Sequence, residues 1–173
     1  MMSLVAASRE PDCPYEVAIV ISDKADAAGL EWAATEGLST LHIPWDRKVK
    51  TQYHQVLDLK LRAAGVETIA LAGYMRLLSD AFVAAWRGRI LNIHPSLLPK
   101  YKGLDTHARA IDAGDAAGGC SVHVVTEELD GGEVLGQAEV PILPGDTPET
   151  LAERVLAEEH RLYPRILSEF VKR

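Results

Sequence analysis

The sequence is poor in cysteine and has no long apolar run. Its two cysteines, Cys13 and Cys120, belong to no CxxC pair, so their spacing predicts no zinc site, and we expect both thiols to be reduced. No apolar run approaches the roughly 20 residues of a membrane helix. No basic segment precedes an apolar stretch near the start, as it does in a signal peptide. These absences predict a cytoplasmic protein that does not enter a membrane.

Basic residues are also in the minority. The chain has 18 Lys and Arg against 25 Asp and Glu, and its net charge is −7. Proteins that hold nucleic acid through its phosphates are normally basic, so nucleic acid is not an expected partner. An anionic small molecule can still bind to a few placed cations and backbone N–H groups. No cluster of ligand residues in the sequence indicates a bound metal.

The length and composition fit one domain. The chain has 173 residues, 47% of them hydrophobic and 25% charged, which is ordinary for a globular protein. No repeat, linker or low-complexity segment divides it. We therefore predict a single domain over residues 1–173, long enough to bury one core without disulfides or a metal.

Strand-like and helix-like segments alternate along the chain. Runs rich in apolar and β-branched residues predict strands, and helical periods that end at glycine predict helices. The predicted strands are 15–23, 39–43, 67–73, 89–94, 119–126 and 133–143. The predicted helices are 1–9, 27–37, 51–64, 79–88, 104–114 and 146–171. Apolar Val56, Leu59 and Leu61 should form one side of the third helix, and Pro164 should break the last helix or start a new one.

This alternation predicts an α/β fold with a Rossmann-like, mostly parallel sheet and helices on both faces. Only six residues separate 119–126 from 133–143, so these two strands should form an antiparallel pair at the C-terminal side. Ligands of such sheets bind beyond the carboxyl ends of the strands. That rule selects the loops that follow Ile21, Gly73 and His94.

The strongest local signal is LNIHPSLLPKYKGLDTHARAI, residues 91–111. Asn92 and His94 are two apart on a predicted strand, so their side chains project from the same face. Pro95 and Pro99 then lead the chain out of the sheet. A histidine at a strand end can exchange protons, and an asparagine amide can donate to a carbonyl oxygen. The alternative is a structural histidine beside a turn-forming asparagine.

A second candidate is the loop TEELDGGEV, residues 126–134. Three acids share this short loop, and two glycines after Asp130 permit a tight turn. The loop is either a solvated acidic hairpin tip or a segment that turns Asp130 inward. In the second case, the carboxylate would pair with His94 and fix the tautomer of its ring.

A third candidate is AGYMRLLS, residues 72–79, which follows a predicted buried strand. Met75, Leu77 and Leu78 could form an apolar slot with Arg76 beside it. Ordinary packing between a strand and the next helix explains the same pattern.

Four ordered strings give the chain a resemblance to a known family. They are LAGYMRLLSDAF, LNIHPSLLPKYKGLDTHARAIDAGD, GCSVHVVTEELDGGEVLGQAEVPI and EEHRLYP, and they run in register from about Glu16 to about Phe170. The chain is similar to the phosphoribosylglycinamide formyltransferases of purine biosynthesis. The resemblance implies the formyltransferase fold and transfer of a formyl group from the co-substrate 10-formyltetrahydrofolate to glycinamide ribonucleotide. It requires no metal, and the protein is expected to be a monomer or a homodimer.

The resemblance also implies roles for particular residues. The implied catalytic trio is Asn92, His94 and Asp130. The implied folate-binding residues are Lys50, Met75, Arg76, Leu77, Leu78, Asn92, Thr126, Glu127, Glu128, Leu129 and Asp130. The implied residues for the ribonucleotide are Pro95, Leu156, Ala157, Glu158 and Glu159.

The chemistry of formyl transfer agrees with these roles. The substrate amine attacks the formyl carbon itself, so the protein needs no serine or cysteine nucleophile. Asn92 and His94 could stabilise the oxyanion that forms. His94, oriented by Asp130, could relay the proton from the attacking amine to the departing N10 of the folate.

The chain departs from this family at its start. The family normally begins with a strand and a Gly-Ser-Gly-Ser-Asn-like loop that binds the substrate phosphate. This chain starts with MMSLVAASRE, which resembles the helix after that loop. The missing strand would be an interior one, so its absence predicts unpaired backbone groups and an open core. We expect the natural protein to be longer; a shortened form, or a natural remnant that keeps the folate half, are the alternatives.

Two other functions compete with the transferase. One is formyltetrahydrofolate deformylase, a hydrolase with a similar trio, against which the string KYKGLDTHARAI favours the transferase. The other is a catalytically impaired folate-binding module. The intact Asn92, His94 and Asp130 argue against a loss of chemistry, whereas the absent phosphate loop argues for weaker substrate binding.

Overall fold

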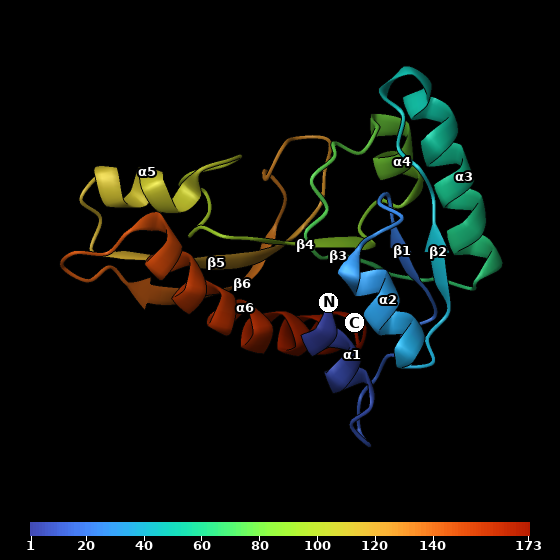
Figure 1. Ribbon diagram of the computed structural model, residues 1–173, viewed down its shortest axis with the longest axis horizontal. Helices are drawn as coiled ribbons and strands as arrows, with labels where there is room; N and C mark the ends of the chain where they lie inside the picture. The colour runs from blue at the N-terminus through green and yellow to red at the C-terminus, as the bar shows by residue number, and fades with distance from the viewer.

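The computed structural model describes the backbone of residues 1–173 and every side chain except that of Arg47. Strands and helices alternate through most of the chain (Figure 1). The strands are β1 Val20–Ser22, β2 Thr40–His42, β3 Ile69–Leu71, β4 Ile90–His94, β5 Ala117–Val124 and β6 Val134–Pro141. The helices are α1 Met2–Ser8, α2 Ala28–Thr35, the 3₁₀ turn η1 Arg47–Val49, α3 Lys50–Ala63, α4 Asp80–Ala85, α5 Thr106–Asp112 and α6 Pro148–Phe170. Each predicted element is therefore present, with shorter bounds at most ends.

The strands form two sheets. β1 and β2 pair in parallel. The second sheet has the order β3-β4-β5-β6, in which β3 and β4 are parallel and the other neighbours are antiparallel. The α/β class and the antiparallel β5–β6 pair are confirmed. The antiparallel part extends one strand further than we expected, because β5 also runs antiparallel to β4.

Strand β4 divides the core into two clusters on opposite faces. Neighbouring side chains on a strand point to opposite sides, so Ile90 packs with α3 and α4, whereas Leu91 packs with α6. Both residues have no exposed surface. Helices therefore cover both faces of the second sheet, as the sequence predicts, and they hold β4 rigidly between them.

Helix α6 is continuous, so the expected break at Pro164 is wrong. Thr147 caps the helix with its side chain, which accepts from the backbone N–H of Thr150. Proline removes one backbone hydrogen bond, but the buried face of α6 lies on both sides of it. Tyr163 in this face contacts the backbone carbonyl oxygens of Leu71 in β3 and Leu91 in β4, at 3.1 and 3.0 Å. Packing of the apolar face keeps the helix together through the proline.

Helix α3 buries only Leu61 of the three apolar residues that we placed on one side of it. It buries Tyr53, His54, Leu57 and Leu61, which follow the helical repeat of about four residues. Leu59 is 65% exposed, and Val56 is also exposed, so they are not core positions. The aromatic residues of the helix are buried in place of these aliphatic ones, against Phe82 and Trp86 of the α4 segment.

Strands β1 and β3 are shorter and less buried than expected. The segment 15–23 contributes only Val20–Ser22 to a strand, and the segment 67–73 only Ile69–Leu71. Both strands have half-buried residues throughout. In the described backbone, no ladder joins β1 to β3.

A cleft of about 720 Å³ separates the two sheets, and its lining comes from both of them. Ile21 of β1 and Ala70 of β3 lie on its walls, together with Leu167 and Phe170 of α6 and Leu4 of α1. The open core that the sequence predicts is found at this place. It explains why β1 and β3 are only half-buried, since each presents one backbone edge to the cleft.

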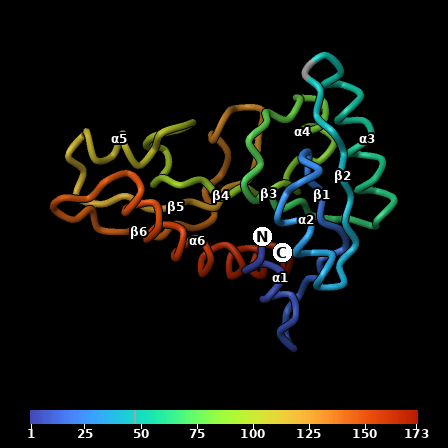
Figure 2. The backbone as a smooth tube through the Cα atoms, viewed as in Figure 1, coloured from blue at the N-terminus to red at the C-terminus, as the bar shows by residue number. Residues whose placement is uncertain are grey.

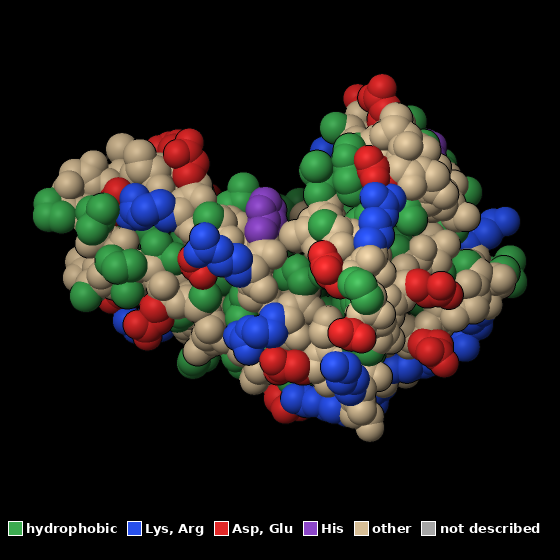
Figure 3. All heavy atoms as spheres, turned by 90° about the horizontal axis from the view of Figure 1, so that it is seen from below, with side chains coloured by type: hydrophobic (Ala, Val, Ile, Leu, Met, Phe, Trp, Pro, Cys, Tyr) green, Lys and Arg blue, Asp and Glu red, His purple; other side chains and the backbone are tan. Residues whose placement is uncertain are grey.

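The two ends of the chain lie side by side, where α1 packs against α6 (Figures 1 and 2). The hydroxyl of Tyr15 donates to the carbonyl of Leu4 and fixes the segment after α1. Seen from the side of α1 and α6, basic and acidic side chains are intermingled over the surface, and one edge is hollowed (Figure 3). No helix of the structure is long and apolar enough to cross a membrane.

Candidate active site

The candidate site lies at the carboxyl end of β4. Asn92 and His94 project from one face of this strand, as their spacing predicts. The antiparallel register places Asn92 opposite His123 and His94 opposite Ser121 of β5. The two predicted residues therefore stand against a second pair of polar residues that are buried within the sheet.

His94 is buried, with 6% of its surface exposed. Its Nε2 lies 2.9 Å from the backbone carbonyl oxygen of Tyr101, an acceptor, so this nitrogen donates. Its Nδ1 lies 3.5 Å from Oδ2 of Asp130. The ring is thus held between a carbonyl and a carboxylate, and the expected pairing of His94 with Asp130 is present.

The inward position of Asp130 depends on the geometry of its loop. Asp130 has a φ of 48°, in the left-handed region that aspartate tolerates better than most residues. Its Oδ2 accepts from the backbone N–H of Gly103 at 2.9 Å. A side chain at Gly132 would collide with the carbonyl oxygen of Val124. The glycines therefore let the loop turn tightly enough to bury this carboxylate, which excludes the simple solvated hairpin tip.

His123 is a site residue that the sequence reasoning missed. It is 2% exposed, and its Nδ1 lies 3.1 Å from the carbonyl oxygen of Val124. Its Nε2 lies 3.3 Å from Nδ2 of Asn92 and 3.5 Å from Oδ1 of Asp130. Burial lowers the pKa of His123 below its usual 6.5, although the contacts to Val124 and Asp130 act in the opposite direction. A histidine inside the apolar run SVHVV was the available signal.

Two further polar residues hold the loop after His94: Ser121, which is buried, and Gln137, which is exposed. Ser121 donates to the carbonyl oxygen of Ser96 at 2.6 Å and accepts from the backbone N–H of Leu98 at 3.0 Å. Gln137 donates to both Ser121 and the carbonyl oxygen of Leu98. These bonds tie the loop to β5 and β6, and so they fix the place of Tyr101, which contacts His94.

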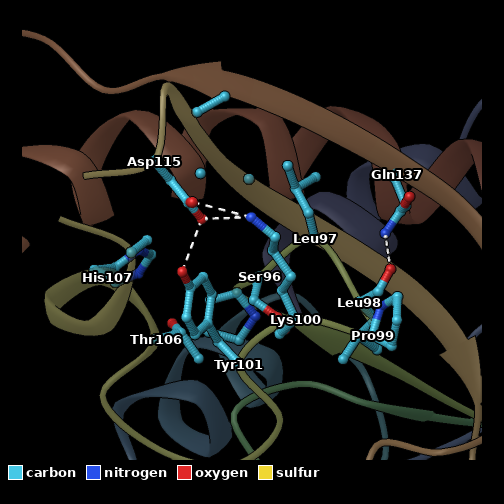
Figure 4. Close-up of a pocket in the computed structure, with 15 residues that line it drawn as sticks. Ser96, Leu97, Leu98, Pro99, Lys100, Tyr101, Thr106, His107, Asp115 and Gln137 are labelled. Carbon is cyan, nitrogen blue, oxygen red and sulfur yellow. Dashed lines mark hydrogen bonds and ion pairs between the residues drawn. The ribbon is translucent and has the colours of Figure 1, made fainter. Parts of the chain in front are cut away.

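A cavity of about 320 Å³ lies beneath this loop (Figure 4). Pro95 and Ser96 line it from the loop after β4, and His107 lines it from α5. On one wall, Asp115 accepts from the ammonium of Lys100 at 2.9 Å and from the hydroxyl of Tyr101 at 2.8 Å. The bond from Lys100 contributes most to lowering the pKa of Asp115. The loop after His94 is thus anchored to β5 and β6 through Ser96 and Leu98, and to Asp115 through Lys100 and Tyr101.

The predicted folate-binding segment 75–78 has an apolar, exposed surface. Met75 is 75% exposed and Leu77 is 64% exposed, and Leu129 of the other predicted loop is also exposed. Leu78 instead packs against the core cluster of α3 and α4. Large exposed apolar side chains on two loops at one end of the sheet are typical of a ligand surface.

Of the two basic residues predicted for the folate, Arg76 has partners within the protein. Arg76 donates to Asp23 at 2.9 Å and lies over the ring of Trp45. Lys50 is the first residue of α3, and the described side chains give it no hydrogen bond to either loop. The structure therefore pairs Arg76 with Asp23 of the loop after β1, and it shows no hydrogen bond or ion pair of Lys50 with the predicted folate loops among the described side chains.

The remaining acidic loop residues face outward. Glu127 pairs with Arg87 at 2.9 Å and Glu128 pairs with Lys102 at 2.7 Å. Thr126 donates to the carbonyl oxygen of Glu128. The outer ion pairs connect this loop to the segment after α4 and to the loop after β4, around the buried Asp130.

The residues predicted for the ribonucleotide are on α6, apart from Pro95. Leu156 and Ala157 are exposed, and Glu158 pairs with Arg161 at 2.6 Å. Glu159 is half-buried, and burial raises the pKa of its carboxyl group, partly offset by the charge of the Met1 amine. No metal-ligating cluster occurs in the part of the chain that the structure describes.

Comparison with known proteins agrees with this geometry. The model of the formyl transferase family matches residues 1–167, so the chain belongs to the formyl transferase family and is a transferase with that fold. It is 42% identical to phosphoribosylglycinamide formyltransferase of Escherichia coli K12, over 98% of this chain and 81% of that protein.

Longer relatives and solved structures carry related names. The chain is 41% identical to the trifunctional purine biosynthetic protein adenosine-3 of Homo sapiens, of which it covers only 17%. The crystal structure of phosphoribosylglycinamide formyltransferase from Brucella melitensis matches with a TM-score of 0.92 and 50% identity. That match covers 98% of this chain and 88% of the crystallised chain.

Proposed function

We propose that this chain transfers a formyl group from 10-formyltetrahydrofolate to the amine of glycinamide ribonucleotide, a step of purine biosynthesis. The observation that carries the proposal is the buried arrangement of Asn92, His94 and Asp130, in which the carboxylate lies 3.5 Å from His94. The names of the relatives with high coverage support the same reaction. Both cysteines are unpaired, which supports a cytoplasmic location.

Asn92 and His94 supply the groups that an acyl transfer needs. The substrate amine forms a bond to the formyl carbon, the bond from that carbon to N10 breaks, and a proton moves from the amine to N10. The amide N–H of Asn92 can donate to the formyl oxygen as negative charge builds on it. His94, oriented by Asp130, can carry the proton between the two nitrogens.

For this relay, one nitrogen of His94 must become available. Nδ1 faces Asp130, so Nε2 is the nitrogen that reaches the reactants. Nε2 donates to the carbonyl oxygen of Tyr101, whose φ of 56° is unusual for a residue other than glycine. We propose that substrate binding displaces this carbonyl and takes its place at Nε2.

The two loops at the sheet end would bind the folate. Met75, Leu77 and Leu129 present the apolar surface that the ring system requires. We propose that Arg76, Leu78 and the segment 126–130 complete this site, and that Lys50 lies toward the anionic tail of the folate. The attraction between Lys50 and the charged tail acts over several ångströms, so it requires no close contact of Lys50 in the unbound protein.

The ribonucleotide would bind between Pro95 and α6. We propose that Glu159, a half-buried carboxylate of α6, contacts the substrate amine. We propose that Leu156, Ala157 and Glu158 line the same region.

One assay tests this function. The protein is mixed with 10-formyl folate, with and without glycinamide ribonucleotide, and the deformylated folate is followed. We expect release that depends on the ribonucleotide. Release without the acceptor would instead identify a deformylase, and tight folate binding without turnover would identify a folate-binding module.

A further inference from the structure

We infer that His123 is a positioning residue that orients the side-chain amide of Asn92, so that one amide N–H stays directed at the reacting carbonyl. The inference rests on the proposed formyl transfer for its functional meaning. The contacts that carry it are those of the His123 ring to Val124 and Asn92, and they belong to the protein without any ligand.

The ring has one arrangement that satisfies both contacts. The neighbour of Nδ1 is the carbonyl oxygen of Val124, at 3.1 Å, and a carbonyl can only accept. Nδ1 must therefore carry a hydrogen, and in a neutral ring this leaves Nε2 as an acceptor. The neighbour of Nε2 is Nδ2 of Asn92, at 3.3 Å, so the amide donates to it.

This contact selects one of two orientations of the Asn92 amide. The NH₂ group has two hydrogens, and His123 takes one of them, so the other remains for a ligand. If the amide were turned by 180°, Oδ1 would face the lone pair of Nε2, and an acceptor would point toward the substrate oxygen. An asparagine without a partner would sample both orientations, and only one of them stabilises an oxyanion.

His123 is held too firmly to turn away. The residue stands opposite Asn92 in the β4–β5 register and is 2% exposed. The charged or titratable groups that face it are Asp130, with Oδ1 at 3.5 Å from Nε2, and His94. Burial lowers the pKa of His123, which supports the neutral ring that the geometry requires.

A double-mutant cycle tests the role in catalysis. A misplaced catalytic group commonly costs on the order of 10²-fold, and we expect His123→Leu to reduce kcat by about that factor. Because His123 acts through Asn92, the double variant His123→Leu/Asn92→Ala should be no slower than Asn92→Ala alone. Multiplied losses in the double variant would overturn the inference.

A conservative variant separates orientation from simple packing. The amide oxygen of His123→Gln can accept from Asn92, so we expect this variant to recover most of the activity that His123→Leu loses. The exposed His42 gives a matched control, and His42→Gln should retain full activity. Equal losses in His123→Gln and His123→Leu, in protein that melts as a folded domain, would contradict the proposed role.

Nuclear magnetic resonance of the unbound protein gives a readout that is independent of turnover. Two-bond ¹H–¹⁵N spectra of the histidines should show His123 with a protonated Nδ1 and an unprotonated Nε2 at neutral pH. A side-chain amide signal that is lost in Asn92→Ala should shift in His123→Gln. A protonated Nε2 would overturn the inference. Absence of formyl transfer by the unchanged protein would overturn the proposed function but would leave this spectroscopic test valid.

Discussion

His94 is held between Asp130 on one side and the carbonyl oxygen of Tyr101 on the other. Because the ring of His94 is the proton carrier of the proposed step, His94→Ala should lower the rate of transfer by about 10²–10⁴-fold. Binding of the folate should persist, since its proposed surface lies on other loops. The change is measured by turnover and by folate titration.

The control is His42→Ala on the exposed surface of β2, which should leave both quantities unchanged. Turnover of His94→Ala at the normal rate would rule out the proton relay, whatever the folate affinity.

His54 is buried without satisfying its polar atoms. Neither ring nitrogen has a hydrogen-bond partner among the described side chains, and the ring packs against Trp45, Tyr53 and Phe82. A buried polar group without a partner costs about 1–3 kcal/mol. We therefore expect His54→Phe to raise the free energy of unfolding by about 1 kcal/mol, as measured by urea denaturation.

The stabilisation by His54→Phe should be larger at acid pH than at neutral pH. Burial, followed by the charge of Lys50, lowers the pKa of His54 below 6.5 in the folded state. As the pH falls below 6.5, the unfolded chain binds a proton that the folded chain does not, so stability falls with pH. The variant His54→Phe lacks this titrating group, so its free energy of unfolding should fall less as the pH is lowered. Identical pH dependence of the two proteins between pH 7.5 and 5.5 would show that His54 does not titrate in this way.

At the scale of elements, the loop between β5 and β6 depends on glycine. A methyl group at Gly132 would collide with the carbonyl oxygen of Val124, so Gly132→Ala should displace the loop and carry Asp130 away from His94. We expect a fall in turnover of roughly 10²-fold, as for other misplaced groups, together with a lower melting temperature.

Gly37 provides the matched control for this change. It has a φ of 77° and no atom near its missing Cβ, and asparagine tolerates that conformation. Gly37→Asn should therefore keep full activity. If Gly132→Ala behaved in the same way, the loop would be less constrained than its contacts indicate.

Local sequence patterns predicted some features of the helices correctly and others only in part. Ser79 caps α4, as its position before an apolar segment predicts, by accepting from the backbone N–H of Phe82. The prediction for α3 was right for Leu61 and wrong for Val56 and Leu59, whose places in the buried face are taken by Tyr53, His54 and Leu57. Which face of α3 is buried depends on the residues that pack against it, and one of these, Phe82, is distant from α3 in the sequence.

At the scale of the molecule, the cleft between β1 and β3 is the least complete part of the fold. Each strand presents an unpaired backbone edge to it, and the walls are largely apolar. An apolar strand, with a Gly-Ser-Asn loop, added ahead of Met1 should pair with both edges and raise the melting temperature.

The same addition should tighten binding of glycinamide ribonucleotide, because the loop supplies backbone N–H groups for its phosphate. The comparison requires a control extension in which prolines alternate along the strand, since proline cannot donate to a ladder. Calorimetry measures the melting temperature, and titration measures the affinity for glycinamide ribonucleotide. Unchanged affinity would place the phosphate elsewhere.

The sequence by itself determined the α/β class and the order of the elements, because periodicity is local in the chain, and its ordered motifs carried the resemblance that implies the trio Asn92, His94 and Asp130. Only the tertiary structure decided that His123 faces Asn92, that Ser121 and Gln137 hold the loop after His94, and that the two sheets are separated by a cleft. Each of these depends on the register of strands or on packing between distant segments, which a single sequence does not display.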